Sequence, residues 1–485
     1  MARRKLVSVC MIARDEEALV GRAIRSTASL ADEVVLIDTG STDRTVEIAQ
    51  TLGAHVYHDA WQDDFARARN AALEHARYEW IVMLDADEWF DREGARRLRT
   101  VLQRVPDDVS GFTLRIVNTL VGRPEAVIDR TNIFRVFRNR PAHRYTGAIH
   151  EQIVHTLEDG RVGRSDITLW HDGYDPGRAA ERGKVERNLR ILRAERARLA
   201  ETDPRTWYVE MQMGTEQLRR RDPGQAVGHF LAAVRLVWDM PYAVMNAPSI
   251  SVLVGQSTRT LVQLGRAQEA FALADHFVQS GWNLPSVWFG RGYAAIETGD
   301  AVTGVRDLLW SVSLAEAMED SLDYTSETQL QISWGLAVRA LLAHGAPEAA
   351  AALAVHGLRG RPEDGDLLAL ASEISRRVPG LVAFLQARLP RAAAWPFARQ
   401  AAAEGRADVV AAMAARLAAD GDPHAAVAEA LVALARGDRQ EAVRRLSSVR
   451  ADSPAYAAAK FALDRLRPGA GDEDRAGHGE EVVAI

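Results

Sequence analysis

Hydrophobic positions over residues 6–103 alternate between two patterns. Short apolar runs rich in β-branched residues each precede a longer segment in which apolar residues recur at helical spacing. The strand-like runs are 6–13, 34–38, 55–57 and 80–85. The helical segments are 18–29, 42–52, 64–76 and 92–103. This alternation predicts βαβ units around a parallel sheet that helices cover on both faces.

The pattern changes beyond residue 103. The segments GFTLRIVN, TNIFRVFRN, YTGAIHEQIV and DITLWHDGY, between residues 111 and 174, have the pattern of strands joined by turns. Residues 178–200 instead have helical spacing and a basic solvent face, which is typical of a connecting helix. We therefore predict a mixed α/β domain with a β-rich second half over residues 1–175, followed by a connecting helix over 176–204.

Pairs of helical segments separated by short polar turns fill residues 205–467. The turns QLGRAQEA and ETGDAVTG place Gly265 and Gly299 34 residues apart, which is the tetratricopeptide period, although the spacing drifts elsewhere. A pair such as 207–237 cannot bury its apolar face alone and must stack on its neighbours, so an all-α solenoid is expected. Residues 468–485 are rich in turn-forming and charged residues and are expected to be disordered.

Composition narrows the class of protein. The 485 residues, 47% of them hydrophobic, can bury full cores in about two to four domains. A net charge of −6 gives no reason to expect a nucleic-acid partner. The single cysteine, Cys10, excludes an internal disulfide and fits a reducing cytoplasm. Charged residues from Arg14 onward interrupt the first apolar run, so neither a signal peptide nor a membrane span is expected.

The stretch VVLIDTGSTDRT contains the Asp-Thr-Gly sequence of aspartic proteases. Those enzymes need two carboxylates that share a proton, and no second Asp-Thr-Gly occurs here. Asp38 instead ends a strand, Gly40 allows a tight turn, and Ser41 or Thr42 is expected to cap a helix. This arrangement favours Asp38 as an acceptor for a nucleotide base or ribose beside a phosphate-binding helix N-terminus, with a purely capping carboxylate as the alternative.

The stretch LDADE places Asp85 and Asp87 at the end of the fourth expected strand. Ligands of open α/β sheets bind at the carboxyl ends of the strands. A sugar-nucleotide donor leaves as a diphosphate, and an ion such as Mg²⁺ or Mn²⁺, which prefers oxygen ligands, disperses the developing charge. The two carboxylates are therefore candidates to hold a metal ion and a ribose, and solvated turn residues are the alternative.

Five ordered motifs resemble the inverting family 2 glycosyltransferases of GT-A fold, and in particular a bacterial subgroup with C-terminal tetratricopeptide repeats. They are LVSVCMIARDEE, VVLIDTGSTDRT, WQDDFARARNAALEHARYEWIVMLDADEW, AIHEQI and LWHDGY. The subgroup includes S-glycosyltransferases that act on glycocin-type peptides. The likeness covers roughly residues 5–175, whereas the repeats agree in architecture only. It implies an α/β GT-A nucleotide-diphospho-sugar transferase domain followed by an all-α TPR-like solenoid.

The resemblance also implies roles for individual residues. Those implied to bind the nucleotide sugar are Ala13, Arg14, Glu16, Asp38, Arg69, Asp85 and Ala86. Asp38 would hold the uracil and Asp85 would reach the ribose. Asp87 would bind the metal, and His171 would complete the metal shell or touch the diphosphate, unless it is a structural histidine.

Inversion requires a carboxylate that takes the proton of the attacking acceptor. Glu151 is the first candidate because it follows an apolar segment and lies beside His150, and Asp172 is the second. A surface ion-pair partner is the alternative role for Glu151. A thiol acceptor that arrives as thiolate would depend less on this base, so variants at Glu151 would keep part of their activity.

The sequence thus predicts a cytoplasmic, metal-dependent glycosyltransferase that uses a UDP-sugar with Mn²⁺ or Mg²⁺. Solenoids present extended binding surfaces, so the expected acceptor is a Cys, Ser or Thr side chain of a peptide or protein held by the repeats. Two alternatives are a glycan or lipid-linked acceptor and an interaction scaffold without chemistry. A homodimer formed through the helical repeats is compatible with this interpretation.

Overall fold

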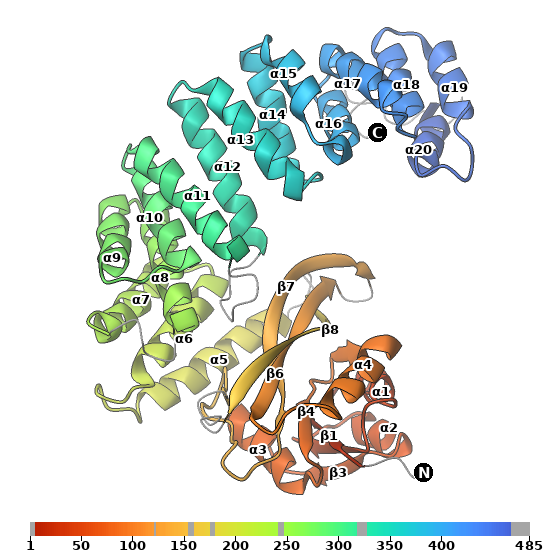
Figure 1. Ribbon diagram of the computed structural model, residues 1–485. Coiled ribbons are helices and arrows are strands. Elements are labelled where there is room, and N and C mark those ends of the chain that lie inside the picture. The colour runs from red at the N-terminus through yellow and green to blue at the C-terminus, as the bar shows by residue number, and fades with distance from the viewer. Residues whose placement is uncertain are drawn as a thin grey trace. The chain divides into compact units, whose positions relative to one another are not determined.

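The computed structural model of the chain describes residues 5–120, 123–153, 160–174, 180–240, 247–317 and 327–466 (Figure 1). The chain divides into two compact units: residues 1–294 with 313–329, and residues 295–312 with 330–485. The first compact unit holds the whole sheet and the first helices of the helical region. The tail expected over 468–485 and the boundary expected at residue 175 lie outside the described residues.

One mixed sheet, with strand order β3-β2-β1-β4-β7-β6-β8-β5, joins the strands of the described part of the chain. Strands β1 to β4 are parallel, as the alternating pattern predicted, and β7 runs antiparallel to β4. The bounds are β1 (Val7–Ala13), β2 (Glu33–Asp38), β3 (His55–His58), β4 (Trp80–Met83), β5 (Glu88–Phe90), β6 (Val109–Leu120), β7 (Arg123–Arg138) and β8 (Arg161–Tyr174).

Helices cover both faces of the parallel strands because successive side chains of a strand point to opposite faces. Trp80 and Val82 of β4 pack in the cluster that includes residues of α1 (Val20–Ser26), α2 (Thr45–Thr51) and α4 (Arg92–Leu102). Ile81 and Met83 pack in the opposite cluster with α3 (Phe65–His75). The two-sided burial explains why these strands have continuous apolar sequences.

The helix expected to start at residue 42 starts at Thr45, so the predicted cap at Ser41 or Thr42 is wrong. Both residues instead bind Asp15 in the neighbouring loop. The Asp15 N–H donates to Ser41 Oγ at 3.0 Å, and the Thr42 N–H donates to Asp15 Oδ1 at 2.7 Å. Contacts between the two loops therefore replace the local cap.

The segment 145–153, expected as a strand, has no strand; its one pairing is an isolated bridge between Thr146 and Gln152. Gly147 and His150 have φ angles of 93° and 52°, which extended chains do not adopt. The segment therefore folds back as a loop. Strand β5, which pairs with β8, had no counterpart in the sequence prediction because it is short and follows an acidic turn.

The connecting helix and the helix pairs are confirmed. Gly265 and Gly299, with φ angles of 73° and 92°, follow the ends of α8 and α10. The N–H of the residue after each glycine donates to the carbonyl five residues before it, from Arg266 to Leu261 and from Asp300 to Ala295. This is the Schellman motif, which glycine favours. The helices are α5 (Ala180–Arg196), α6 (Thr206–Arg219), α7 (Pro223–Val237), α8 (Ala247–Gln263), α9 (Ala267–Gln279), α10 (Pro285–Glu297), α11 (Ala301–Ala317), α12 (Glu327–Ala343), α13 (Pro347–Gly360), α14 (Gly365–Arg377), α15 (Leu381–Arg388), α16 (Arg391–Ala403), α17 (Ala407–Ala419), α18 (Ala425–Ala435), α19 (Arg439–Ser447) and α20 (Tyr456–Leu466).

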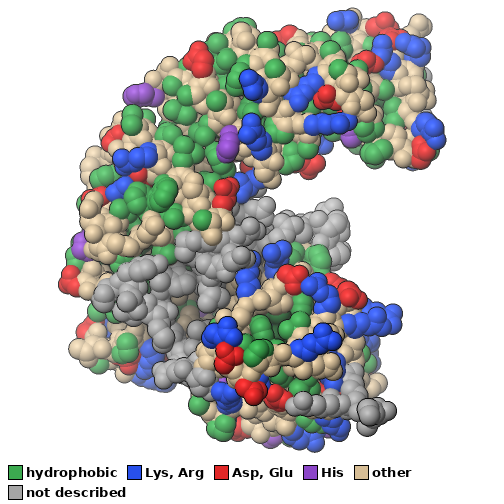
Figure 2. All heavy atoms as spheres, in the orientation of Figure 1, with side chains coloured by type: hydrophobic (Ala, Val, Ile, Leu, Met, Phe, Trp, Pro, Cys, Tyr) green, Lys and Arg blue, Asp and Glu red, His purple; other side chains and the backbone are tan. Residues whose placement is uncertain are grey.

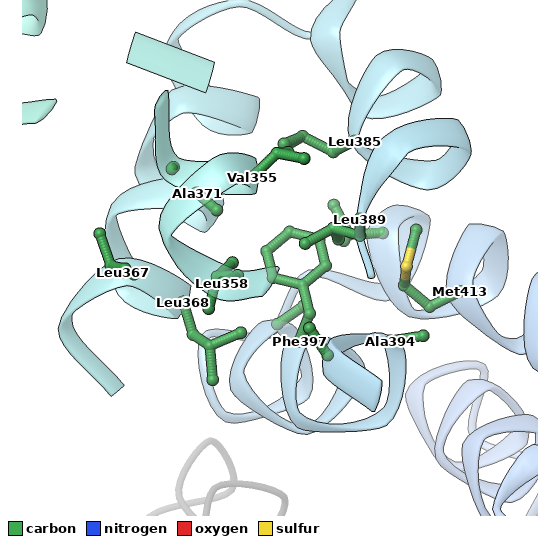
Figure 3. Close-up of a cluster of buried hydrophobic side chains, with 14 of the residues drawn as sticks. Val355, Leu358, Leu367, Leu368, Ala371, Leu385, Leu389, Ala394, Phe397 and Met413 are labelled. Carbon is green, nitrogen blue, oxygen red and sulfur yellow. The ribbon is translucent and has the colours of Figure 1, made fainter. Parts of the chain in front are cut away.

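The second compact unit has its own apolar core. Phe397 of α16 is fully buried and lies among side chains of α13 to α17 (Figure 3). Leu358, Leu368 and Met413 are neighbours in this cluster. Helices from α12 to α18 contribute apolar side chains to this cluster, as expected of stacked repeats, and α19 and α20 pack in a second cluster.

Charged side chains of both signs are interspersed on the visible face of the molecule, in agreement with the small net charge (Figure 2). Among the described residues, none of the helices has the length and apolar character needed to cross a membrane.

Two glycines of the first helix pair provide a test of its packing. A Cβ at Gly214 would lie 2.5 Å from the buried ring of Phe230, whereas a Cβ at Gly228 would meet no atom within 4 Å. We expect Gly214→Ala to lower the free energy of unfolding by about 1–3 kcal/mol through overpacking. Gly228→Ala, the matched control on α7, should raise it by about 0.5–1 kcal/mol. Denaturant titrations measure both, and equal effects would contradict this packing.

Candidate functional site

The carboxyl ends of β1, β2 and β4 bring the predicted nucleotide-binding residues to one edge of the sheet. Ala13 is paired in register with Asp38, and Cys10 of β1 is paired with Met83 of β4. The residues that follow Met83 therefore emerge beside the ends of the neighbouring strands. This edge is where ligands of open α/β sheets bind.

Asp38 is buried and accepts hydrogen bonds from its own turn. The backbone N–H groups of Gly40 and Ser41 donate to its carboxylate at 3.3 and 3.1 Å, and His58 Nδ1 lies 3.1 Å from Oδ2. Burial raises the pKa of Asp38, but these hydrogen bonds outweigh burial and hold the pKa below its usual range. Asp38 is therefore ionised, and part of its acceptor capacity stabilises the turn.

The loop after β1 is fixed by the loop after β2. The Glu16 N–H donates to Thr45 Oγ1 at 2.7 Å, and Asp15 adopts a left-handed φ of 54°, which Asp tolerates better than most residues. Arg14 is largely exposed, with its Nε 3.7 Å from Asp15 Oδ2. The guanidinium of Arg14 can therefore reorient towards a ligand, whereas Glu16 is held through its backbone.

Two buried arginines hold Asp85 from both sides. Arg69 Nη2 lies 2.8 Å from Asp85 Oδ1, and Arg135 Nη2 donates to Asp85 Oδ2 at 2.6 Å. Arg135 also donates to Glu88 Oε1 at 2.6 Å. Burial raises the pKa of Asp85, but the charges of Arg135 and Arg69 outweigh it and hold the pKa well below its usual range. Asp85 is thus ionised and rigidly oriented.

Arg135 and Glu88 were not among the residues predicted from the sequence. Arg135 lies on β7 next to Val136, which is paired with Val82 of β4. The sequence separates Arg135 from Asp85 by 50 residues, and the pairing of β7 with β4 brings them together. Burial raises the pKa of Glu88 above its usual value, whereas the pKa of its neighbour Asp85 is lowered.

Asp87 and His171 lie together at the next turn of the chain. Asp87 Oδ2 is 3.3 Å from His171 Nε2, and the two side chains are 30% and 27% exposed. The pairing of β5 with β8 places them, since Glu88 is opposite His171. Burial lowers the pKa of His171, but the Asp87 carboxylate outweighs it and raises the pKa above its usual value.

Asn118, another residue that the sequence did not reveal, orients this histidine. Its Oδ1 lies 2.8 Å from His171 Nδ1, so Nδ1 carries a proton and neutral His171 has a lone pair on Nε2. With Asp87, this offers one oxygen and one nitrogen ligand to Mn²⁺ or Mg²⁺. No group of three or more His, Cys, Asp or Glu side chains that could hold a metal ion occurs in the described ranges. Donor phosphates and water would supply the remaining ligands.

Glu151 belongs to the same charged network as Asp85. Arg69 Nε donates a hydrogen bond to Glu151 Oε1, while its Nη2 lies against Asp85. The Glu151 side chain is 12% exposed. A carboxylate held by a buried arginine and open on one side has the placement that a general base requires.

Asp172 faces away from His171, because adjacent residues of a strand point to opposite faces. Its side chain is 3% exposed, lies 2.8 Å from Arg22 Nη2, and accepts a hydrogen bond from Thr119 Oγ1 at 3.0 Å. The Arg22 guanidinium in turn lies 3.7 Å from the centre of the Trp89 ring. These contacts leave Asp172 less accessible than Glu151, so the geometry favours Glu151 as the base.

Comparisons with known proteins agree with this architecture. The model of the family "Glycosyl transferase family 2" matches residues 8–156. A TPR repeat-containing protein of Synechococcus elongatus is 37% identical over 194 residues, or 38% of this chain and 47% of that protein. The glycosyltransferase SunS of Bacillus subtilis is 24% identical over 200 residues, or 40% of this chain and 46% of SunS. The chain thus spans about half the length of the curated relatives that it matches.

Two solved structures of different kinds match parts of the chain. The mannosyltransferase PcManGT of Pyrobaculum calidifontis, solved with GDP-Man and Mn²⁺, is 17% identical, with a TM-score of 0.32 over 58% of this chain and 88% of that chain. A tetratricopeptide repeat protein of Parabacteroides merdae is 12% identical, with a TM-score of 0.31 over 59% and 93%. Residues 8–156 are thus similar to glycosyl transferase family 2, and a C-terminal helical region follows this match.

Proposed function

We propose that the chain is an inverting glycosyltransferase that moves a sugar from a nucleotide-diphosphate donor, expected to be a UDP-sugar, to an acceptor side chain. The observation that carries the proposal is the grouping of Asp85, Asp87, Glu151 and His171 at one edge of the sheet. Arg69 joins Asp85 to Glu151, and the pairing of β5 with β8 places Asp87 beside His171. The match of residues 8–156 to the model of glycosyl transferase family 2 supports the reaction class, and the residue roles rest on this geometry.

Each group has a distinct task in the proposed reaction. Asp87 and His171 would hold Mn²⁺ or Mg²⁺, which would supply positive charge to the departing diphosphate. Glu151 takes the proton of the acceptor as it attacks the anomeric carbon from the opposite side. Arg69 orients Glu151, and together with Arg135 it keeps Asp85 ionised as an acceptor for a ribose hydroxyl.

We propose a peptide or protein side chain, Cys, Ser or Thr, as the acceptor. The helical region offers stacked pairs, and such repeats bind extended polypeptides. The family subgroup that the motifs resemble includes S-glycosyltransferases of glycocin-type peptides, which also supports this acceptor.

A glycan acceptor is the second candidate, because the lipopolysaccharide core biosynthesis glycosyltransferase LpsC of Rhizobium meliloti is 29% identical over 167 residues. Mass spectrometry of peptide and oligosaccharide acceptors incubated with a panel of UDP-sugars distinguishes the two.

The metal site can be tested by donor binding. With Mn²⁺ and a UDP-sugar, the wild-type protein should melt at a higher temperature than without them, since a ligand of the native state stabilises it. Asp87→Ala should abolish this increase because it removes the only carboxylate that lies against His171 among the described residues. Asp166→Ala, an exposed carboxylate on β8, is the matched control and should keep it. Equal stabilisation of all three proteins would contradict the metal assignment.

The base can be tested by the rate of transfer. Glu151→Gln keeps the size of the side chain but cannot accept a proton, so kcat should fall about 10²- to 10⁴-fold with an alcohol acceptor while the KM for the donor stays similar. A thiol acceptor should show a smaller loss. Steady-state kinetics on both acceptors gives these values. A larger loss in kcat for Asp172→Asn than for Glu151→Gln would move the role of base to Asp172.

The ionised state of Asp85 depends on Arg135, which gives a prediction for stability. Arg135→Met leaves buried Glu88 and partly buried Asp85 without their shared cation and should lower the free energy of unfolding at pH 7 by about 3–5 kcal/mol. The pKa of Asp85 in the folded protein lies below the unfolded value of about 3.9. The contribution of ionised Asp85 to the free energy of unfolding is therefore present above about pH 3.9 and is lost as the pH falls through the folded pKa.

The difference in stability between wild type and Arg135→Met should therefore shrink on acidification below about pH 4. Denaturant titrations at several pH values measure it. Arg161→Met, which removes an exposed arginine paired with exposed Asp108, is the control and should change stability little. A pH-independent difference would show that Arg135 acts through packing alone.

A further inference from the structure

The loop that carries Glu151 has a strained and closed conformation. We call residues 146–152 the site loop. Its ends pair through hydrogen bonds between the backbones of Thr146 and Gln152, at 2.9 and 3.0 Å. Within it, His150 has a left-handed φ of 52°, a conformation that costs a non-glycine residue free energy and persists only where surrounding contacts hold it. The position of Glu151 therefore depends on what holds His150 as well as on Arg69, which binds the Glu151 carboxylate.

One side of the site loop is fixed to the α/β domain. Asn70 of α3 makes two hydrogen bonds to the backbone of Tyr145, at 2.8 and 2.9 Å, just before the loop begins. The Phe65 N–H donates to Ala148 O at 2.7 Å. These contacts fix the start of the loop, but they do not reach His150 or Glu151.

The other side of the site loop is fixed to α5 and α6 of the helical region. The Ala148 N–H donates to Glu195 Oε2 at 3.1 Å, and His150 Nε2 lies 3.4 Å from Glu216 Oε1. The buried side chain that packs between these contacts is Ile149. Its apolar neighbours on the two helices are Ile191, Leu192, Val209 and Met213.

Glu216 is a carboxylate that folding has removed from water. Its side chain is 0% exposed. Asn188 Nδ2 at 3.1 Å and Arg219 Nη1 at 2.9 Å donate to its Oε1, and His150 Nε2 lies 3.4 Å from the same oxygen, at ion-pair distance without a hydrogen bond. An unpaired charge at such a depth is costly, so these partners are needed to keep Glu216 ionised. Burial raises its pKa, but the partners outweigh burial and lower it.

We propose that Glu216 of α6 is a positioning residue for sugar transfer: by holding His150 in its left-handed conformation it sets Glu151 against the acceptor. The proposal rests on the proposed function, in which Glu151 is the base. It makes α5 and α6 part of the catalytic unit, although they lie outside the residues matched by the family model.

The chain offers a matched control on the same helix. Glu210 is also a largely buried carboxylate of α6 with a histidine and an arginine as partners, His229 Nδ1 at 2.8 Å and Arg196 Nε at 2.6 Å. Neither partner belongs to the site loop. Glu216→Gln and Glu210→Gln therefore remove the same charge from the same helix, and only the first change removes a charge that faces His150.

Amide hydrogen exchange and kinetics on the full chain test the proposal. In Glu216→Gln, the amides of residues 146–152 should exchange at least tenfold faster than in wild type, and kcat should fall about tenfold to a hundredfold with an unchanged KM for the UDP-sugar. Glu210→Gln should leave both quantities as in wild type. His150→Asn, which tolerates the left-handed φ but does not reach Glu216, should reproduce the effects of Glu216→Gln.

The outcomes separate this proposal from the proposed function. Unchanged exchange of the site loop in Glu216→Gln, or equal acceleration in Glu210→Gln, would overturn the positioning role whether or not transfer is observed. Faster exchange of the loop with an unchanged kcat would overturn it as well. A wild-type protein that transfers no sugar, and whose site loop nevertheless loosens in Glu216→Gln, would overturn the proposed function and with it the catalytic part of this inference. The double variant Glu216→Gln with His150→Asn should lose no more activity than either single variant.

Discussion

The pairing of partly buried Asp85 with the buried arginines Arg69 and Arg135 is the interaction on which the candidate site depends. A carboxylate at this depth is costly unless cations and hydrogen bonds compensate for its lost hydration. The two arginines come from α3 and from β7, so the same contacts tie a helix, an antiparallel strand and the end of β4 to one point. Because Arg69 also holds Glu151, the orientation of the candidate base follows from the same balance of charge.

Much of the α/β domain could be predicted from local sequence. The strand-like and helical patterns of apolar residues located each parallel strand and each covering helix. Most of their ends were predicted to within three residues, because both faces of the strands are buried. The strand ends then located Asp38, Asp85 and Asp87 on one edge. Arg135 and Asn118 could not be found in this way, because they reach the site only through the pairing of β7 with β4 and of β6 with β8.

The local errors have a common physical cause. The residues expected to cap α2 bind Asp15 instead, and the segment expected as a strand before Glu151 folds into the site loop. In both cases contacts to another part of the chain outweigh local preference, since a side chain such as Ser or Asp can satisfy backbone groups of its own turn or of a neighbouring loop. Both exceptions lie next to the candidate site. Sequences are expected to depart from local structural preferences mainly at functional sites.

The site loop also shows why the limits of a family match need not be those of a working unit. The matched residues end at 156, whereas the compact unit that contains them continues through residue 294. Catalysis by proximity requires that reacting groups be held within a fraction of an ångström, and a loop fixed on one side only cannot achieve this. Contacts from α5 and α6 to residues 148–150 supply the second side, so the first helices after the sheet act together with Arg69 in placing Glu151.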